Sequence, residues 1–171
     1  MLTVAETTTQ VDVKADTAQE FMTGGNKKFG SNNLGVTTYH LDPTYTYNKD
    51  KTIASATICM KLKTTMPKWV KGSKTPDKAN MDALNQIVAL IAKHEQKHRD
   101  TYKQTFNKSD VDKTVIGKTD DQAQKVLDGL AGDLDKVCED LHSKEGKIHV
   151  VQTGGTFKVT MVPAGSGGCK P

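Results

Sequence analysis

The residues best suited to chemistry lie in the run from 93 to 100, which contains the spacing H-E-x-x-H. Residues four apart share one face of a helix, so His94 and His98 can both reach one zinc ion at about 2.0–2.1 Å. Glu95 is rotated about 100° from His94 around the helix axis, which places its carboxylate beside the metal. There it can take a proton from a water that zinc activates. The pattern predicts a zinc site with two histidine ligands and Glu95 as the general base.

The sequence around this motif has the period of an amphipathic helix. Apolar residues recur at helical spacing upstream and downstream of it, at Leu84, Ile87, Val88, Ile91, Tyr102 and Phe106. The stripe predicts a helix from about residue 77 to 106, with both imidazoles and the carboxylate on its inward face. Two satisfied core histidines are the alternative interpretation. Metal binding is favoured, because an acid and two imidazoles on an apolar face need a partner.

Two histidines do not complete a catalytic zinc site, which uses three protein ligands and a water. A second amphipathic helix is predicted from about 119 to 145, and the connecting loop makes the two helices antiparallel neighbours. Reflecting positions through the loop centre places Asp133 opposite His94, which makes Asp133 the first candidate for the third ligand. His142 and His149 are better ligand types that lie farther away in this register, and they remain alternatives.

Composition limits the class of protein and its partners. The chain has 171 residues, a formal net charge of +4 and 35% apolar residues, which indicates one domain with its own core. Its lysines are spread over the whole length, and no basic run is interleaved with aromatic residues, so no nucleic-acid partner is expected. No apolar stretch approaches the roughly 20 residues of a membrane helix, so no membrane association is expected either.

The remaining segments predict the fold class. Alternating β-branched, aromatic and polar residues predict strands at about 9–14, 36–41, 44–47, 52–62, 147–152 and 156–162. The order of elements indicates an α+β fold: an antiparallel sheet packed on the long H-E-x-x-H helix and a second antiparallel helix, with a C-terminal β-hairpin. Residues 1–8 are predicted to fray, 9–163 to form the single domain, and 164–171 to be a flexible tail.

The chain resembles a bacterial family described as predicted secreted zinc-dependent proteases, the DUF922 group. The likeness rests on the order of four features: a strand with Cys59, a turn at Pro67–Trp69, H-E-x-x-H at His94–His98, and a second helix with Cys138. It covers roughly residues 36–141. The resemblance implies a zincin-like zinc metallopeptidase that acts on a protein or peptide substrate. It also implies a secreted or periplasmic location, although the chain carries no recognisable signal peptide.

The resemblance implies a disulfide between Cys59 and Cys138 as well, because both match cysteine positions in the family. Two buried free thiols are the alternative. One departure concerns the C-terminal part, where family members tend to close with a Thr-x-His-Gly segment. This chain has Thr153-Gly154-Gly155 there, without the histidine. A secreted, non-enzymatic binding module with a structural or degenerate zinc site is therefore the alternative to a peptidase.

Overall fold

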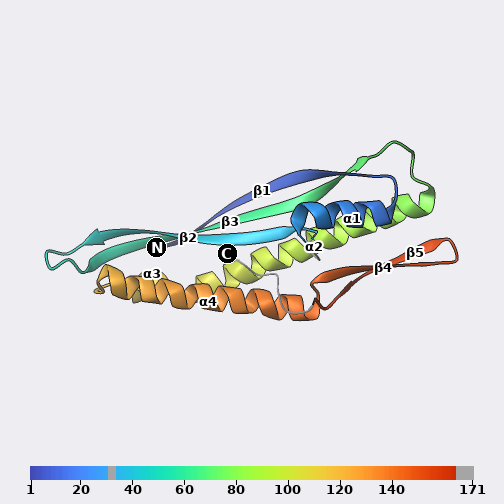
Figure 1. The fold of residues 1–171 in the computed structure, drawn as a ribbon. Helices are drawn as coiled ribbons and strands as arrows, with labels where there is room; N and C mark the ends of the chain where they lie inside the picture. Colours follow the sequence, from blue (N-terminus) through green and yellow to red (C-terminus); the bar gives the residue numbers. More distant parts are fainter. Residues whose placement is uncertain (31–33, 165–171) are drawn as a thin grey trace.

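The computed structural model describes residues 1–30 and 34–164. The elements in chain order are β1 (Leu2–Ala15), α1 (Ala18–Phe29), β2 (Val36–Tyr47), β3 (Ile53–Lys71), α2 (Lys78–Lys108), α3 (Val111–Thr114), α4 (Asp120–Lys144), β4 (Lys147–Thr153) and β5 (Thr156–Val162) (Figure 1). This order confirms the predicted α+β class and the C-terminal hairpin. None of the helices in the described part of the chain is long and apolar enough to cross a bilayer. The predicted tail lies outside the described residues, apart from Ala164, whose amide donates to the His142 carbonyl oxygen.

Within the described residues, the strands form a three-stranded sheet ordered β1-β3-β2 and a separate β4-β5 hairpin. β2 and β3 are antiparallel. β1 pairs with β3 in parallel, from Leu2 opposite Ile58 to Ala15 opposite Lys71, a pairing that the predicted antiparallel sheet does not contain. The predicted fraying of residues 1–8 is wrong. This threonine-rich, β-branched segment suits a pleated strand, and β3 supplies its ladder partners.

α2 runs along the sheet (Figure 1). Its side chains belong to two apolar clusters. Near its start, Leu84, Ile87 and Ile91 pack with residues of β1, α1 and β4. Near its end, Tyr102 and Phe106 pack with residues of β2, β3 and α4. The H-E-x-x-H motif therefore lies between two apolar clusters on one buried helix face.

α4 lies against α2, but the linker between them does not turn back at once. α3 is part of this linker. The Gly117 amide donates to the Ile53 carbonyl oxygen at 2.8 Å, and the Ile53 amide donates to the Lys118 carbonyl oxygen at 2.8 Å. The linker is thus fastened to the start of β3, beyond the end of α2. At 1.5 Å per residue, His98 lies about 15 Å from the end of α2, and His142 about 33 Å from the start of α4. The two helices are offset by about three helical turns.

Cys59 lies on the face of the sheet opposite the one against which Cys138 of α4 packs. On β3, Ile58 and Met60 are buried in the same apolar cluster as Cys138 of α4. Cys59 lies between them, and successive side chains of a strand point to opposite faces. Among the described residues, Cys59 is a free thiol. The predicted Cys59–Cys138 disulfide is therefore wrong.

We expect Cys59→Ser to change the free energy of unfolding by less than about 1 kcal/mol, because the half-buried thiol lies outside both apolar clusters. Loss of a native disulfide would cost about 2–5 kcal/mol. Urea unfolding of the wild type and the variant without reductant measures the difference. Cys59→Ala controls for the new hydroxyl, and a loss of about 2 kcal/mol or more in both variants would contradict the free thiol.

Candidate metal centre

α2 presents two histidines one turn apart on its buried face. The helix begins after Asp77, whose carboxylate accepts the Asn80 amide at 2.8 Å, and continues through a segment rich in Ala, Leu and Gln, which are strong helix formers. The His94 side chain is almost fully buried and that of His98 is 3% exposed. Their Nε2 atoms are 3.0 Å apart. The predicted convergence of the two imidazoles on the inward face is confirmed.

A third imidazole comes from His142, near the end of α4. Its Nε2 atom is 3.0 Å from that of His98, and its ring stacks on that of His94 with a centroid separation of 5.3 Å. One nitrogen of each ring lies within 4.8 Å of those of the other two. His142 was one of the alternatives that the sequence left open, and the structure brings it into the cluster.

The structure does not bring the other two candidates to this site. Asp133 is exposed and lines a surface hollow with Thr105 and Ser109, near the C-terminal end of α2. His149 is exposed on β4. The preference for Asp133 is therefore wrong, because reflection through the loop centre assumes an immediate turn. The linker instead displaces α4 by about three turns, which brings His142 to His98.

The three nitrogens have a spacing that suits a tetrahedral metal ion. Bonds of about 2.0–2.1 Å at tetrahedral angles place neighbouring ligand nitrogens about 3.3 Å apart, close to the 3.0 Å separations here. The Nδ1 atoms of His94 and His98 are buried and have no hydrogen-bond partner among the described residues. The Nε2 atoms are the ones that face each other, at 3.0 Å, and the donor set fits a metal ion.

The protonation state of the cluster also suits metal binding. Burial, and then the neighbouring imidazole of His142, lower the pKa of His94 to about 4. Burial and the other two imidazoles lower the pKa of His98 to about 3, and burial also lowers that of His142. The imidazoles are therefore neutral at pH 7, and a metal ion does not have to displace protons from them.

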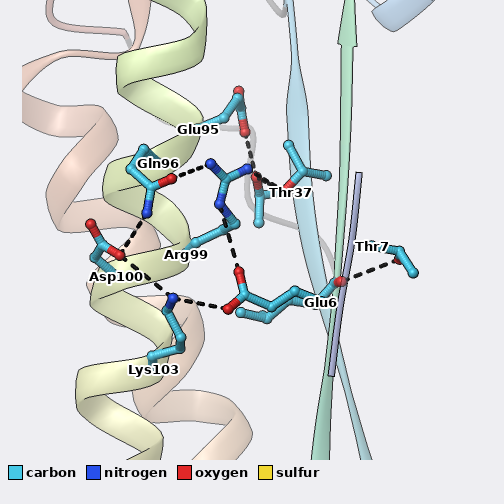
Figure 2. A network of polar contacts seen from close by, with 10 residues as sticks. Glu6, Thr7, Thr37, Glu95, Gln96, Arg99, Asp100 and Lys103 are labelled. Atoms are coloured by element: carbon cyan, nitrogen blue, oxygen red, sulfur yellow. Dashed lines mark hydrogen bonds and ion pairs between the residues drawn. The ribbon is translucent and has the colours of Figure 1, made fainter. Parts of the chain in front are cut away.

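Glu95 lies beside the histidines and is 3% exposed. Its Oε2 atom accepts a hydrogen bond from Thr37 Oγ1 at 2.6 Å (Figure 2). Its Oε1 atom lies close to Gly35, where an added Cβ would be 2.8 Å from it. Burial raises the pKa of Glu95 to about 7, against the Thr37 hydrogen bond and the positive charge of Arg99, which lower it. A carboxyl group with this pKa can both accept and return a proton at neutral pH.

Two hollows connect Glu95 with the three imidazoles. Both are lined by Gly35, Glu95 and His142. The larger is also lined by His94 and by four apolar residues, Leu34, Ile91, Ile148 and Met161. The smaller also reaches His98. The Glu95 carboxyl group therefore lines both hollows, each together with two of the three imidazoles.

Two buried threonines near Glu95 were not predicted from the sequence. Thr37 of β2 and Thr64 of β3 are cross-strand partners, and both are buried. Their side chains point inward, as do those two positions away on the same strands, Tyr39 on β2 and Leu62 on β3. A threonine at an inward position of an alternating strand, facing a second one, is the signal that could have identified them.

The comparisons with known proteins identify a family. A family model described as "Bacterial protein of unknown function (DUF922)" matches residues 8–144, which include all three histidines and Glu95. No curated protein and no solved structure matches the chain.

We expect His142→Ala to weaken zinc binding by more than about 100-fold, because loss of a direct ligand should exceed the 10–100-fold effect of outer-shell changes. Calorimetry or competition with a chromophoric chelator measures the affinity. Asp133→Ala and His149→Ala are the matched controls and should bind zinc as the wild type does. Loss of affinity in either control, with none in His142→Ala, would contradict the three-histidine assignment.

The metal-free protein should lose stability as the pH falls below 6.5. The reference pKa of both buried histidines is 6.5, whereas in the folded state the values are about 4 and about 3. Between these values the unfolded chain binds protons that the folded state does not, so the stability present above pH 6.5 is lost as the pH falls. Glu95 acts in the opposite sense, since its folded pKa of about 7 exceeds 4.5 and its contribution is lost as the pH rises between these values.

Thermal unfolding of chelator-treated protein between pH 7 and pH 4 tests this expectation. The Tm of the wild type should fall more steeply with decreasing pH than that of His98→Gln, which has no imidazole to protonate. His149→Gln, at an exposed position, is the control and should keep the wild-type slope. Equal slopes for the wild type and His98→Gln would contradict the lowered pKa.

Proposed function

The chain belongs to the DUF922 family of bacterial proteins of unknown function, and from that premise we propose that it is a zinc-dependent peptidase with Glu95 as general base. The observation that carries this proposal is the convergence of three imidazoles beside one buried carboxyl group, which lines a hollow with each of them. Closed structural zinc sites use four protein ligands, whereas catalytic sites use three and leave a position open. Among the described residues the donor set has three members, which favours a catalytic site.

Each residue has a defined role in this proposal. The Nε2 atoms of His94, His98 and His142 would hold the zinc ion. When bound, zinc supplies Lewis-acid chemistry that polarises the scissile carbonyl and acidifies water. Glu95 takes the proton of the attacking water and transfers it to the leaving amine.

The edge strand and the hollows beside Glu95 favour an extended protein or peptide segment as the substrate. β2 is an edge strand in the order β1-β3-β2, and it begins at Val36, next to a residue that lines both hollows. A peptide can add to a sheet edge through main-chain hydrogen bonds. The apolar lining of the larger hollow supports an apolar side chain near the cleaved bond. The family resemblance supports action outside the cytoplasm.

A purely structural zinc site is the second candidate. It is favoured by the origin of the ligands, because His142 of α4 and the two histidines of α2 would let a metal ion clamp the two helices together. The two candidates differ in whether the zinc-loaded protein cleaves peptides.

Glu95→Gln should retain zinc and cleave casein or a quenched peptide about 10²–10⁴-fold more slowly, because all three imidazoles remain while the general base is lost. Values of kcat/KM, measured with and without chelator, give the effect. Glu139→Gln, an exposed acid on α4, is the matched control. Undiminished turnover by Glu95→Gln would rule out its role, and a zinc-loaded wild type without any cleavage would favour the structural site.

A further inference from the structure

We propose that Arg99, Thr64 and Thr37 form a hydrogen-bond relay of fixed direction that positions the Glu95 carboxyl group. They are positioning residues, since they act on the proposed reaction through the Glu95 carboxyl group. This inference rests on the proposed role of Glu95 as the general base. The sheet, together with the helix that carries Glu95, then sets the place of the reacting oxygen.

Three consecutive hydrogen bonds make the relay. Arg99 Nη1 donates to Thr64 Oγ1 at 3.1 Å. The Oγ1 atoms of Thr64 and Thr37 are 3.1 Å apart. Thr37 Oγ1 donates to Glu95 Oε2 at 2.6 Å (Figure 2). The Arg99 guanidinium is thereby connected to the buried Glu95 carboxyl group through two buried threonine hydroxyls.

Proton counting gives the relay one direction. A guanidinium group only donates hydrogen bonds, so Thr64 accepts from Arg99. Thr37 directs its single hydroxyl proton to Glu95, so it must accept the proton of Thr64. Each hydroxyl then donates once and accepts once. If the Glu95 carboxyl group turned away, the Thr37 proton would be left unpaired at a buried position, which is costly.

The donor end of the relay is held from the outside. The Arg99 guanidinium also donates to Gln96, and its Nε atom is 3.8 Å from Glu6 Oε2 on β1 (Figure 2). Glu6 accepts a hydrogen bond from Lys103 Nζ at 2.9 Å, and the Arg99 side chain is 14% exposed. These contacts limit the rotamers of Arg99, so its Nη1 atom stays directed at Thr64.

The acceptor end of the relay leaves one oxygen for chemistry. With Oε2 fixed by Thr37, the Oε1 atom of Glu95 lies against Gly35, which lines both hollows. Thr37 and Thr64 are direct partners in the β2-β3 register, so the ladder fixes their separation. The carboxyl group is therefore held by two elements at once, α2 through its backbone and the sheet through the relay.

Paired variants at Thr37 test the relay. Thr37→Val removes the hydroxyl at nearly constant volume, and we expect kcat to fall about 10–100-fold, as for a small misplacement of a reacting group. Zinc affinity and KM should stay as in the wild type. Thr37→Ser retains the hydroxyl and should keep kcat within about threefold. A variant Thr37→Val with a lowered Tm but unchanged kcat per zinc-loaded molecule would assign Thr37 a purely structural role and overturn the proposal.

A second position tests whether the two threonines act as one unit. Thr64→Val does not alter any atom that touches Glu95, yet it removes the donor to Thr37, so kcat should fall in the same sense. The double variant Thr37→Val/Thr64→Val should be no slower than Thr37→Val alone, because the relay is already broken. Independent, multiplying losses from the two substitutions would overturn the relay.

Failure of the proposed function is distinguishable from failure of the relay. If the zinc-loaded wild type cleaves no peptide, the function is refuted, and the relay is judged from crystal structures of Thr37→Ser and Thr37→Val. The Glu95 carboxyl group should keep its position in the serine variant and rotate in the valine variant. An unmoved carboxyl group in Thr37→Val would overturn the relay whatever the activity.

Discussion

The burial of one continuous face of α2 is the constraint on which the rest of the structure depends. Ile87 and Phe106 belong to apolar clusters at opposite ends of this face, so the helix cannot rotate or slide without exposing one of them to water. The polar motif lies between the clusters and is buried with them. Each polar group there needs a partner from another element, and His142 from α4 and Thr37 from β2 provide two of these partners. Packing of the helix thus determines which residues can complete the site.

Burial acts on the acid and on the bases of the site in opposite directions. It disfavours the charged form of each group, so the pKa of His94 and His98 falls while that of Glu95 rises. Neutral imidazoles suit a metal ion, and a carboxyl group of pKa about 7 suits proton transfer, so one physical cause prepares both functions. The same burial leaves the Nδ1 atoms of the two α2 histidines without a partner among the described residues.

Local patterns in the sequence were sufficient for the helix that carries the motif, since its apolar period and the spacing of its two histidines are properties of a single element. The third histidine required the relative placement of two helices. That placement is set by hydrogen bonds between Gly117 and Ile53, which no helical period contains. Cys59 shows a different limit, because the alternation of β3 already places it opposite the buried residues, and the family likeness led to the wrong pairing. The parallel partner of β1 is non-local and leaves no periodic signal.

The parallel pairing of β1 with β3 has a consequence for folding. Thr9 and Thr65, which contact each other across this pair, are 56 positions apart in the chain. Closing so long a loop costs entropy before any contact is gained, so β1 should dock late, after the local β2-β3 hairpin. Until then β3, the central strand of the finished sheet, presents an unpaired edge on which another chain could add. The exposed Lys61 and Lys63 on this strand are the kind of side chains that discourage such association during folding.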